Sequence, residues 1–257
     1  MTKTLTLIAA ASFVLAVACL SGAAALGWNG VHDHHLGWGH NWSINMDDGG
    51  HDVRSISHYS TSDSADGSTA TREIAWNGTD KLDLDIAADV QFTQAPGPAK
   101  LVVTGPKDAV EHVVLDGSHL QYDDDGDYSG KLQVTLSAPN VSRFAINGAG
   151  ALAIDGYNQD QLAVDVSGSG DVTAKGRTRD LSVDISGDGN VDMSGLTAAT
   201  AQAQISGSGR AAIAPTDAAD VHISGDGEID LKTHPAKLTS DVSGSGRIIE
   251  GDETKPS

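Results

Sequence analysis

The chain has 257 residues, with 16 Lys plus Arg against 35 Asp plus Glu, which gives a formal net charge of -19. Nucleic acids and anionic lipid head groups repel such a polyanion, so this balance argues strongly against a nucleic-acid-binding protein. Aromatic residues make up only 4% of the chain whereas 30 residues are Gly, which suits thin, closely stacked strands better than a bulky globular core.

Residues 1–27 carry an export signal. Lys3 is the only charged residue before an almost wholly apolar run from Leu5 to Leu26, and such a segment directs export. Two small-x-small sequences in the run fit a cleavage site, but a run of about 22 residues is also long enough to span a bilayer. A cleaved signal peptide and a retained membrane anchor are therefore both open, with a lipoprotein acylated at Cys19 as a third alternative. Each places the rest of the chain outside the cytoplasm.

Residues 28–72 are rich in Gly, Ser, Asp and His and have no sustained periodicity, which predicts a flexible tether. Neutral imidazoles beside Asp33 are suitable ligands for Zn, Cu or Ni. The candidate metal ligands are His32, His34, His35 and His40. A preformed site needs a rigid frame that this composition does not provide, so a solvated linker is the favoured interpretation.

From about Glu73 the sequence changes to short alternating strands bounded by Gly, Pro or Asp clusters. Leu82, Leu84 and Ile86 share one face, with Asp83 and Asp85 opposite. Further strands are expected at Val90–Phe92, Leu101–Val103, Val113–Leu115, Leu120–Tyr122 and Leu132–Leu136. Residues 107–114 are expected to form at most a turn or two of helix.

The acidic run Asp123–Asp127 contains a Gly at position 126, which is too early for a calcium-binding EF-hand loop. A solvated hairpin tip is the favoured prediction for this run.

A repeat dominates the second half of the chain. Six times, an aliphatic residue is followed by a small polar residue and then by Gly-x-Gly, in steps of 20, 19, 20, 18 and 19 residues. Such regularity predicts a chain that winds into stacked turns. Gly permits the positive φ or the close backbone approach that a tight corner needs. The predicted structural turns are at Gly148, Gly150, Gly168, Gly170, Gly187, Gly189, Gly207, Gly209, Gly225, Gly227, Gly244 and Gly246.

The alternation within each copy predicts which side chains point inward. One inward column comprises Ile146, Val166, Ile185, Ile205, Ile223 and Val242. A second inward column comprises Leu152, Val172, Val191, Ala211, Ile229 and Ile248. A second bend in each turn is expected at Gly156, Gly176, Gly195, Pro215 and Thr233. Ser240, two residues before Val242, and Glu250, two residues after Ile248, also fall at inward positions but are polar. Polar residues are expected there, because the stack ends and its open edge must resist further pairing.

The repeats Ser-Gly-Ser-Gly-Asp-Val at Ser167–Val172 and Ser-Gly-Asp-Gly-Asn-Val at Ser186–Val191 resemble those of the bacterial head GIN domain (DUF2807) family, described as autotransporter-adhesin heads. The segment Asp80–Gln94 resembles the opening of the same domain. The resemblance covers roughly residues 73–250 and implies a parallel β-helix-like fold in an envelope or secreted protein. It brings no established catalytic residues, and the His-rich tether falls outside it.

The Ser-Gly-Asp-Gly corners are also similar to calcium-binding β-rolls. Asp188 and Asp226 lie on alternate turns, however, which places them about 10 Å apart. One calcium ion needs its oxygen ligands at roughly 2.3–2.6 Å, so a structural turn is the better interpretation.

A carbohydrate-active enzyme is the second functional hypothesis, because many parallel β-helices cleave polysaccharides. Glycoside hydrolysis requires two carboxylates about 5–9.5 Å apart in a cleft, and Asp171 and Asp188 sit at the same corner of neighbouring turns. The turns carry no long insertions that would wall a cleft, so two exposed turn carboxylates are favoured.

The sequence therefore predicts an all-β chain: a parallel β-helix or solenoid of about six rungs of 18–20 residues, preceded by irregular strands and an N-terminal apolar export helix. The predicted head covers residues 73–250, and residues 251–257 are expected to be a disordered tail. The predicted function is a noncatalytic, adhesin-like protein of the cell envelope (periplasm, membrane-anchored or cell surface) that binds a glycan or an envelope protein, with no cofactor. A structural spacer or self-associating head is the third alternative. Membrane contact is expected through the N-terminal segment if it is not cleaved.

Overall fold

The computed structural model describes residues 59–62 and 68–251. The predicted export segment, the four candidate histidines of the tether and residues 252–257 lie outside the described residues. No helix in the described part of the chain is both long and apolar enough to cross a bilayer.

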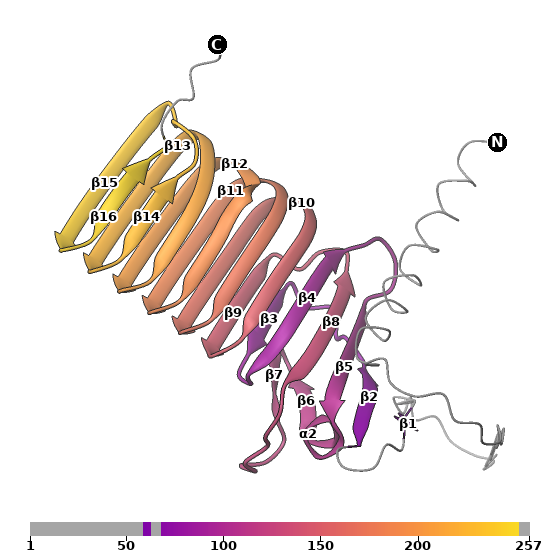
Figure 1. Ribbon diagram of the computed structural model, residues 1–257. Coiled ribbons are helices and arrows are strands. Elements are labelled where there is room, and N and C mark those ends of the chain that lie inside the picture. Colours follow the sequence, from indigo (N-terminus) through magenta and orange to yellow (C-terminus); the bar gives the residue numbers. More distant parts are fainter. Residues whose placement is uncertain (1–58, 63–67, 252–257) are drawn as a thin grey trace, which may run out of the picture. The chain divides into compact units, whose positions relative to one another are not determined.

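Nearly all of the described chain is β-structure, as predicted (Figure 1). The elements before the repeats are β1 (Tyr59–Ser62), β2 (Thr69–Ile74), β3 (Lys81–Leu84), β4 (Ala88–Gln94), β5 (Lys100–Pro106), α2 (Lys107–His112), β6 (Val113–Asp116), β7 (His119–Tyr122) and β8 (Leu132–Ala138). The strands of the repeats are β9 (Arg143–Gly148), β10 (Ala151–Gly168), β11 (Asp171–Gly187), β12 (Asn190–Gly207), β13 (Arg210–Gly225), β14 (Glu228–Leu231), β15 (Lys237–Gly244) and β16 (Arg247–Glu250).

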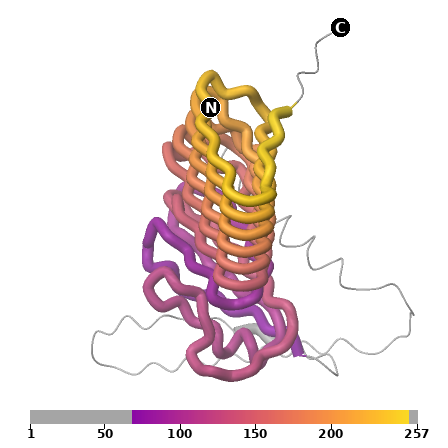
Figure 2. Tube along the Cα trace, turned by 90° about the vertical axis from the view of Figure 1, so that its left-hand side faces the viewer, coloured from indigo at the N-terminus to yellow at the C-terminus, as the bar shows by residue number. Residues whose placement is uncertain are grey.

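The repeats form a parallel solenoid of about five turns (Figures 1 and 2). Equivalent residues of successive turns lie side by side: Val166 pairs with Ile185, Ile185 with Ile205, and Ile205 with Ile223. The solenoid prediction is confirmed. The six Gly-x-Gly corners lie next to one another in one continuous row along the solenoid.

The predicted inward columns form the core of the solenoid. From Ile146 to Ile223 and from Leu152 to Ile229, every member is at most 2% exposed. The columns open only in the last turn, where Val242 is 41% exposed and Ile248 is half-buried. Burial of aliphatic side chains stabilises a fold by about 1.5–3 kcal/mol for each large residue, so these columns supply much of the driving force for stacking.

The two positions of a Gly-x-Gly corner require glycine for different structural reasons. The first has positive φ, as at Gly187 (φ 125°), which an L side chain rarely adopts. The second lies against the core: a Cβ built on Gly189 would come within 2.6 Å of Val166 Cγ1 in the preceding turn. Gly-x-Gly therefore combines a backbone conformation with a packing requirement.

The segment Lys81–Gln94 is more regular than expected, because it forms a turn of the solenoid without a Gly-x-Gly corner. β3 pairs in parallel with β9 and β4 with β10, so that Leu84 lies beside Ile146 and Phe92 beside Ile154. Below this turn the pairing changes: β4 pairs in parallel with β8, but β8–β5, β5–β2 and β2–β1 are antiparallel. Ordered strands therefore begin inside the segment 28–72 that its composition assigns to a tether.

The short helix α2 spans six residues, in agreement with the expected turn or two, and buries Ala109 and Val110. The predicted hairpin tip at Asp123–Asp127 is wrong. This run connects β7 to β8, and these strands do not pair with each other: β7 joins β3 and β6, whereas β8 joins β4 and β5.

Asp83 lies on the face opposite the core, as its position in the strand predicts, yet it is only 1% exposed. The loop before β7 covers it. Ser118 Oγ donates to Asp83 Oδ2 at 2.6 Å, and Lys81 Nζ lies 2.9 Å from Oδ1. A buried carboxylate is tolerated only with such partners, so Asp83 fastens the β7 segment to the first turn.

Candidate functional site

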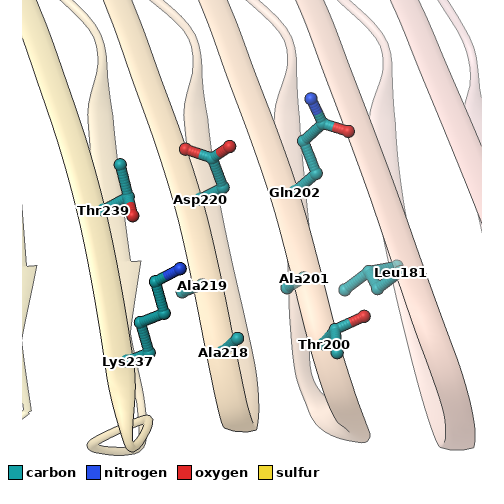
Figure 3. A pocket seen from close by; sticks show the side chains of 9 residues that line it. All are labelled: Leu181, Thr200, Ala201, Gln202, Ala218, Ala219, Asp220, Lys237 and Thr239. Carbon is teal, nitrogen blue, oxygen red and sulfur yellow. The ribbon is translucent and has the colours of Figure 1, made fainter.

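A shallow groove of about 290 Å³ crosses one face of the solenoid near its C-terminal end (Figure 3). It spans four strands, β11, β12, β13 and β15. Its lining residues are Leu181, Thr200, Ala201, Gln202, Ala218, Ala219, Asp220, Lys237 and Thr239.

The groove follows from the register of the strands. Gln202, Asp220 and Thr239 are paired neighbours and form one row across β12, β13 and β15 (Figure 3). Ala218 lies between Thr200 and Lys237 in the adjacent row. A one-carbon side chain between larger neighbours leaves the depression, and polar groups line both of its sides.

Several polar groups of the groove lack a full set of protein partners. Asp220 Oδ1 is buried and accepts no hydrogen bond, although His222 Nε2 lies 3.0 Å away, at ion-pair distance. Among the described residues, no hydrogen bond or ion pair engages the side chains of Gln202, Lys237 or Thr239. A buried oxygen without a hydrogen bond is costly, so a hydrogen-bond donor on a ligand would stabilise Asp220 Oδ1.

Thr200 at the end of the groove is held by its neighbour in β11. Its Oγ1 donates to Asp180 Oδ1 at 2.9 Å, and Arg179 Nε donates to Asp180 Oδ2 at 3.0 Å. These two hydrogen bonds, that from Thr200 first, keep the pKa of Asp180 below its ordinary value. Asp180 therefore stays ionised and fixes the Thr200 hydroxyl, whose lone pairs remain for a ligand.

The chemistry that this arrangement supports is recognition. Carboxylate, amide, ammonium and hydroxyl groups together match the donors and acceptors of a polyhydroxylated ligand. Hydrolysis of a glycosidic bond requires a pair of carboxylates, and Asp220 is the one carboxylate that lines the groove.

The acidic corner residues considered from the sequence lie elsewhere. Asp171 and Asp188 are both exposed, and neither lines the groove. Asp188 and Asp226 are separated by the turn that carries Ser208, because Gly207 pairs with Gly187 on one side and with Gly225 on the other. The corners therefore carry these carboxylates on alternate turns, as their spacing requires.

A second polar cluster joins α2 to the loop after β7. His112 Nδ1 lies 2.9 Å from Asp123 Oδ1 and 3.4 Å from Asp124 Oδ2. Tyr128 donates its hydroxyl to Asp124 at 2.8 Å and stacks on the His112 ring, with the ring centroids 4.9 Å apart. The three ligating atoms lie within 4.8 Å of one another, so a divalent cation would find one nitrogen and two oxygen ligands here.

Sequence reasoning missed both the groove and this cluster. The groove depends on Ala218 lying beside Lys237 of the next turn. The repeat predicts the register of neighbouring turns, but the outward residues vary from turn to turn. His112 and Asp123 are brought together by the antiparallel pairing of β6 with β7. The Asp116-Gly117 pair between the two predicted strands is the signal that could have identified this hairpin.

The fold and groove together define a class: a parallel β-solenoid head, closed at one end by antiparallel strands and bearing a polar groove on one face. The sequence places it further. The family described as putative auto-transporter adhesin, head GIN domain (DUF2807) matches residues 78–235, and the chain belongs to this family.

Three solved structures are similar to this chain, and the first of them shares its fold. A protein described as a putative adhesin from Bacteroides fragilis NCTC 9343 is 22% identical, with a TM-score of 0.60 over 71% of this chain and 96% of its own. A putative lipid binding protein from Parabacteroides distasonis ATCC 8503 is 18% identical, with a TM-score of 0.46 over 72% of this chain and 97% of its own. A putative adhesin from Parabacteroides merdae ATCC 43184 is 17% identical, with a TM-score of 0.44 over 72% and 96%. No curated protein sequence matches the chain.

Proposed function

We propose that this protein is an exported, noncatalytic, adhesin-like head of the cell envelope that binds a surface glycan through the groove between Gln202 and Lys237. The observation that carries the proposal is the buried Oδ1 of Asp220, which has His222 Nε2 at 3.0 Å but accepts no hydrogen bond within the described residues, beside three polar side chains that also lack a partner there. Sugar hydroxyls donate hydrogen bonds to carboxylates and accept them from ammonium and amide groups, so a glycan satisfies every member of the row.

Location and family membership support the same reading. The apolar segment Leu5–Leu26 predicts export, and the family is described as one of auto-transporter adhesin heads. A solenoid offers a long, flat surface whose successive turns are spaced about 4.8 Å apart. One polymer chain can therefore lie across several turns. A solvent-exposed groove that binds its ligand through hydrogen bonds has a low affinity for one ligand unit. Low affinity at each site fits an adhesin that acts in many copies.

A glycan array probed with the full chain tests this proposal. Wild-type protein is expected to bind a subset of polysaccharides or oligosaccharides, and Asp220→Ala is expected to lose about tenfold or more in affinity, the effect of removing one hydrogen bond to a charged group. Asp188→Ala removes the same charge from an exposed corner outside the groove and serves as the matched control. Binding that survives Asp220→Ala, or that both variants weaken equally, would contradict the groove as the binding site.

The same glycans should leave the incubation intact. Reducing ends released by wild-type protein, and abolished in an Asp171→Asn, Asp188→Asn double variant, would show a carbohydrate-active enzyme instead. An array without any glycan ligand, together with capture of one envelope protein that Asp220→Ala abolishes, would move the proposal to the protein partner.

A further inference from the structure

The two ends of the solenoid differ. At the N-terminal end the core is covered by β8, β5, β2 and α2, where Leu101, Val103 and Val110 are fully buried. At the C-terminal end the last turn consists of β15 and β16, and no strand among the described residues covers it. Two large hydrophobic residues of this turn are exposed to solvent, Val242 at 41% and Ile249 at 38%.

Both strands of the last turn have a free edge. β15 pairs only with β13, and β16 only with β14. Their outer N–H and C=O groups therefore lack a strand partner within residues 59–62 and 68–251. An unpaired edge over an exposed apolar core is a template for a further strand.

We propose that the C-terminal turn is an interface between two copies of this chain, in which β15 of each copy pairs in antiparallel fashion with β16 of the other. The two strands run in opposite directions on the two sides of one turn. A two-fold axis parallel to them, just beyond the last turn, therefore brings each strand onto the partner's other strand.

The register of this pairing is set by the corner at Ser245. Residues equally distant from the corner fall opposite each other, so Val242 lies opposite the partner's Ile248, and Ser240 opposite the partner's Glu250. All four point inward, since they continue the columns of the core. The pairing thus buries the exposed Val242 against the half-buried Ile248 of the partner and gives the Glu250 carboxylate a hydroxyl donor, whereas Ile249 points outward.

The outward residues bring one pair of opposite charges near each other, in a diagonal contact. Ser243 falls opposite the partner's Arg247, and Asp241 lies diagonally from the same guanidinium and opposite the partner's Ile249. No two like charges face each other directly at this register. Ser240, Asp241 and Glu250 oppose indiscriminate pairing with apolar strands, whereas a second copy presents the residues that match them.

The assembly closes at two copies, because the same surface is used by both partners and the opposite end is covered by the antiparallel strands. Each dimer would carry two grooves. This last consequence rests on the proposed glycan-binding function, since two linked sites raise the avidity for a polymeric ligand; the interface itself does not depend on it.

Disulfide cross-linking of the full chain tests the interface. In a Cys19→Ser background, Asp241→Cys and Ile249→Cys each place one thiol on an outward position of the last turn. Within one chain, residues 241 and 249 lie on opposite sides of the last turn. In the dimer, residue 241 of one copy faces residue 249 of the other, and directly paired Cβ atoms are about 4.5–5.5 Å apart. A mixture of the two variants is expected to give a cross-linked dimer under mild oxidation, and either variant alone is not.

Sedimentation velocity supplies a second measurement that does not depend on the thiols. Wild-type protein, kept in mild detergent, is expected to shift from monomer to dimer as its concentration rises, and Val242→Lys is expected to stay monomeric. Ser245→Lys adds the same charge at the exposed corner and should still dimerise. A monomer at all concentrations with no cross-link in the mixture, or a cross-link formed equally by Asp241→Cys alone, would overturn the proposal. Glycan binding by monomeric protein would leave the proposed function standing.

Discussion

The carbonyl oxygen of Gly187 occupies the space that a side chain of residue 207 would need: a Cβ built on Gly207 would lie 2.5 Å from it. Gly207 also has a φ of 130°, which side chains other than hydrogen rarely adopt. Steric exclusion and backbone conformation therefore both require Gly at this corner.

Gly207→Ala is accordingly expected to destabilise the protein by about 2–4 kcal/mol, because the backbone of the neighbouring turn must move as well as that of the corner. Urea denaturation followed by circular dichroism measures the change.

Gly195→Ala is the control for this prediction. Gly195 has no positive φ, and a Cβ there would lie 2.9 Å from Lys175 Cγ, so the Lys175 side chain but no backbone atom must shift. Its replacement is expected to cost about 1 kcal/mol or less. Equal losses for the two substitutions would show that the corner is not specifically constrained.

The inward column predicts unequal losses for one substitution at two levels of the stack. Val166 is fully buried between turns, whereas Val242 is 41% exposed in the last turn. Val166→Ala is expected to reduce the free energy of unfolding by about 2 kcal/mol, and Val242→Ala by less than half of that, because less apolar area and no closed cavity are involved. Parallel urea titrations, at a protein concentration low enough to keep the chain monomeric, compare them. A larger loss at Val242 would contradict an open C-terminal end.

The solenoid was predictable because its rule is repeated. Each aliphatic residue of the column from Ile146 to Ile223 meets its equivalent in the next turn, so one pattern fixes register, core and corner together. The turn at Lys81–Gln94 obeys the same pairing but bends at Asp85–Ala87 without a Gly-x-Gly, and its regularity was therefore invisible in the sequence.

Features formed by unrepeated contacts were not predicted. Asp123 bonds to His112 because β6 and β7 form a hairpin, and the same strands leave Asp123–Asp127 as a connection between non-pairing strands. Asp83 alternates correctly but is covered by Ser118 from a loop 35 residues away. The depression beside Asp220 depends on one alanine, Ala218, in an outward row where composition varies freely.

Asp184 predicts a pH dependence of stability. Partial burial, followed by the charge of Asp165 on the adjacent strand, raises the pKa of Asp184 above its ordinary value; Gln204 faces it from the other side. The folded state thus holds this proton more tightly than the unfolded chain. The resulting stability is present below the pKa of the unfolded carboxyl and is lost as pH rises through the folded pKa.

Asp184→Asn, which resembles the neutral acid, is therefore expected to be more stable than wild-type protein at pH 7 and equal to it near about pH 3. The gain should be below about 1 kcal/mol, since the group is partly solvated. Urea titrations at both pH values measure it, with Asp188→Asn, an exposed corner carboxylate, as the matched control. A gain that is the same at both pH values would contradict the ionisation argument.

The contact between His112 and Asp123 also predicts a loss of stability as pH rises, here because a cation is stabilised in the folded state. The hydrogen bond that His112 Nδ1–H donates to Asp123, followed among the raising influences by the charge of Asp124, lifts the pKa of His112 above its ordinary value of about 6.5. Stability from the ionised pair is fully present below the pKa of the unfolded imidazole and is lost as pH rises through the folded pKa. Asp123→Asn should lower the pKa of His112, followed by the pH dependence of its Cε1–H resonance in NMR spectra. Asp127→Asn removes the same charge from the same loop without touching His112 and should leave the titration in place. A His112 resonance that titrates identically in all three proteins would show that the contact does not persist in solution.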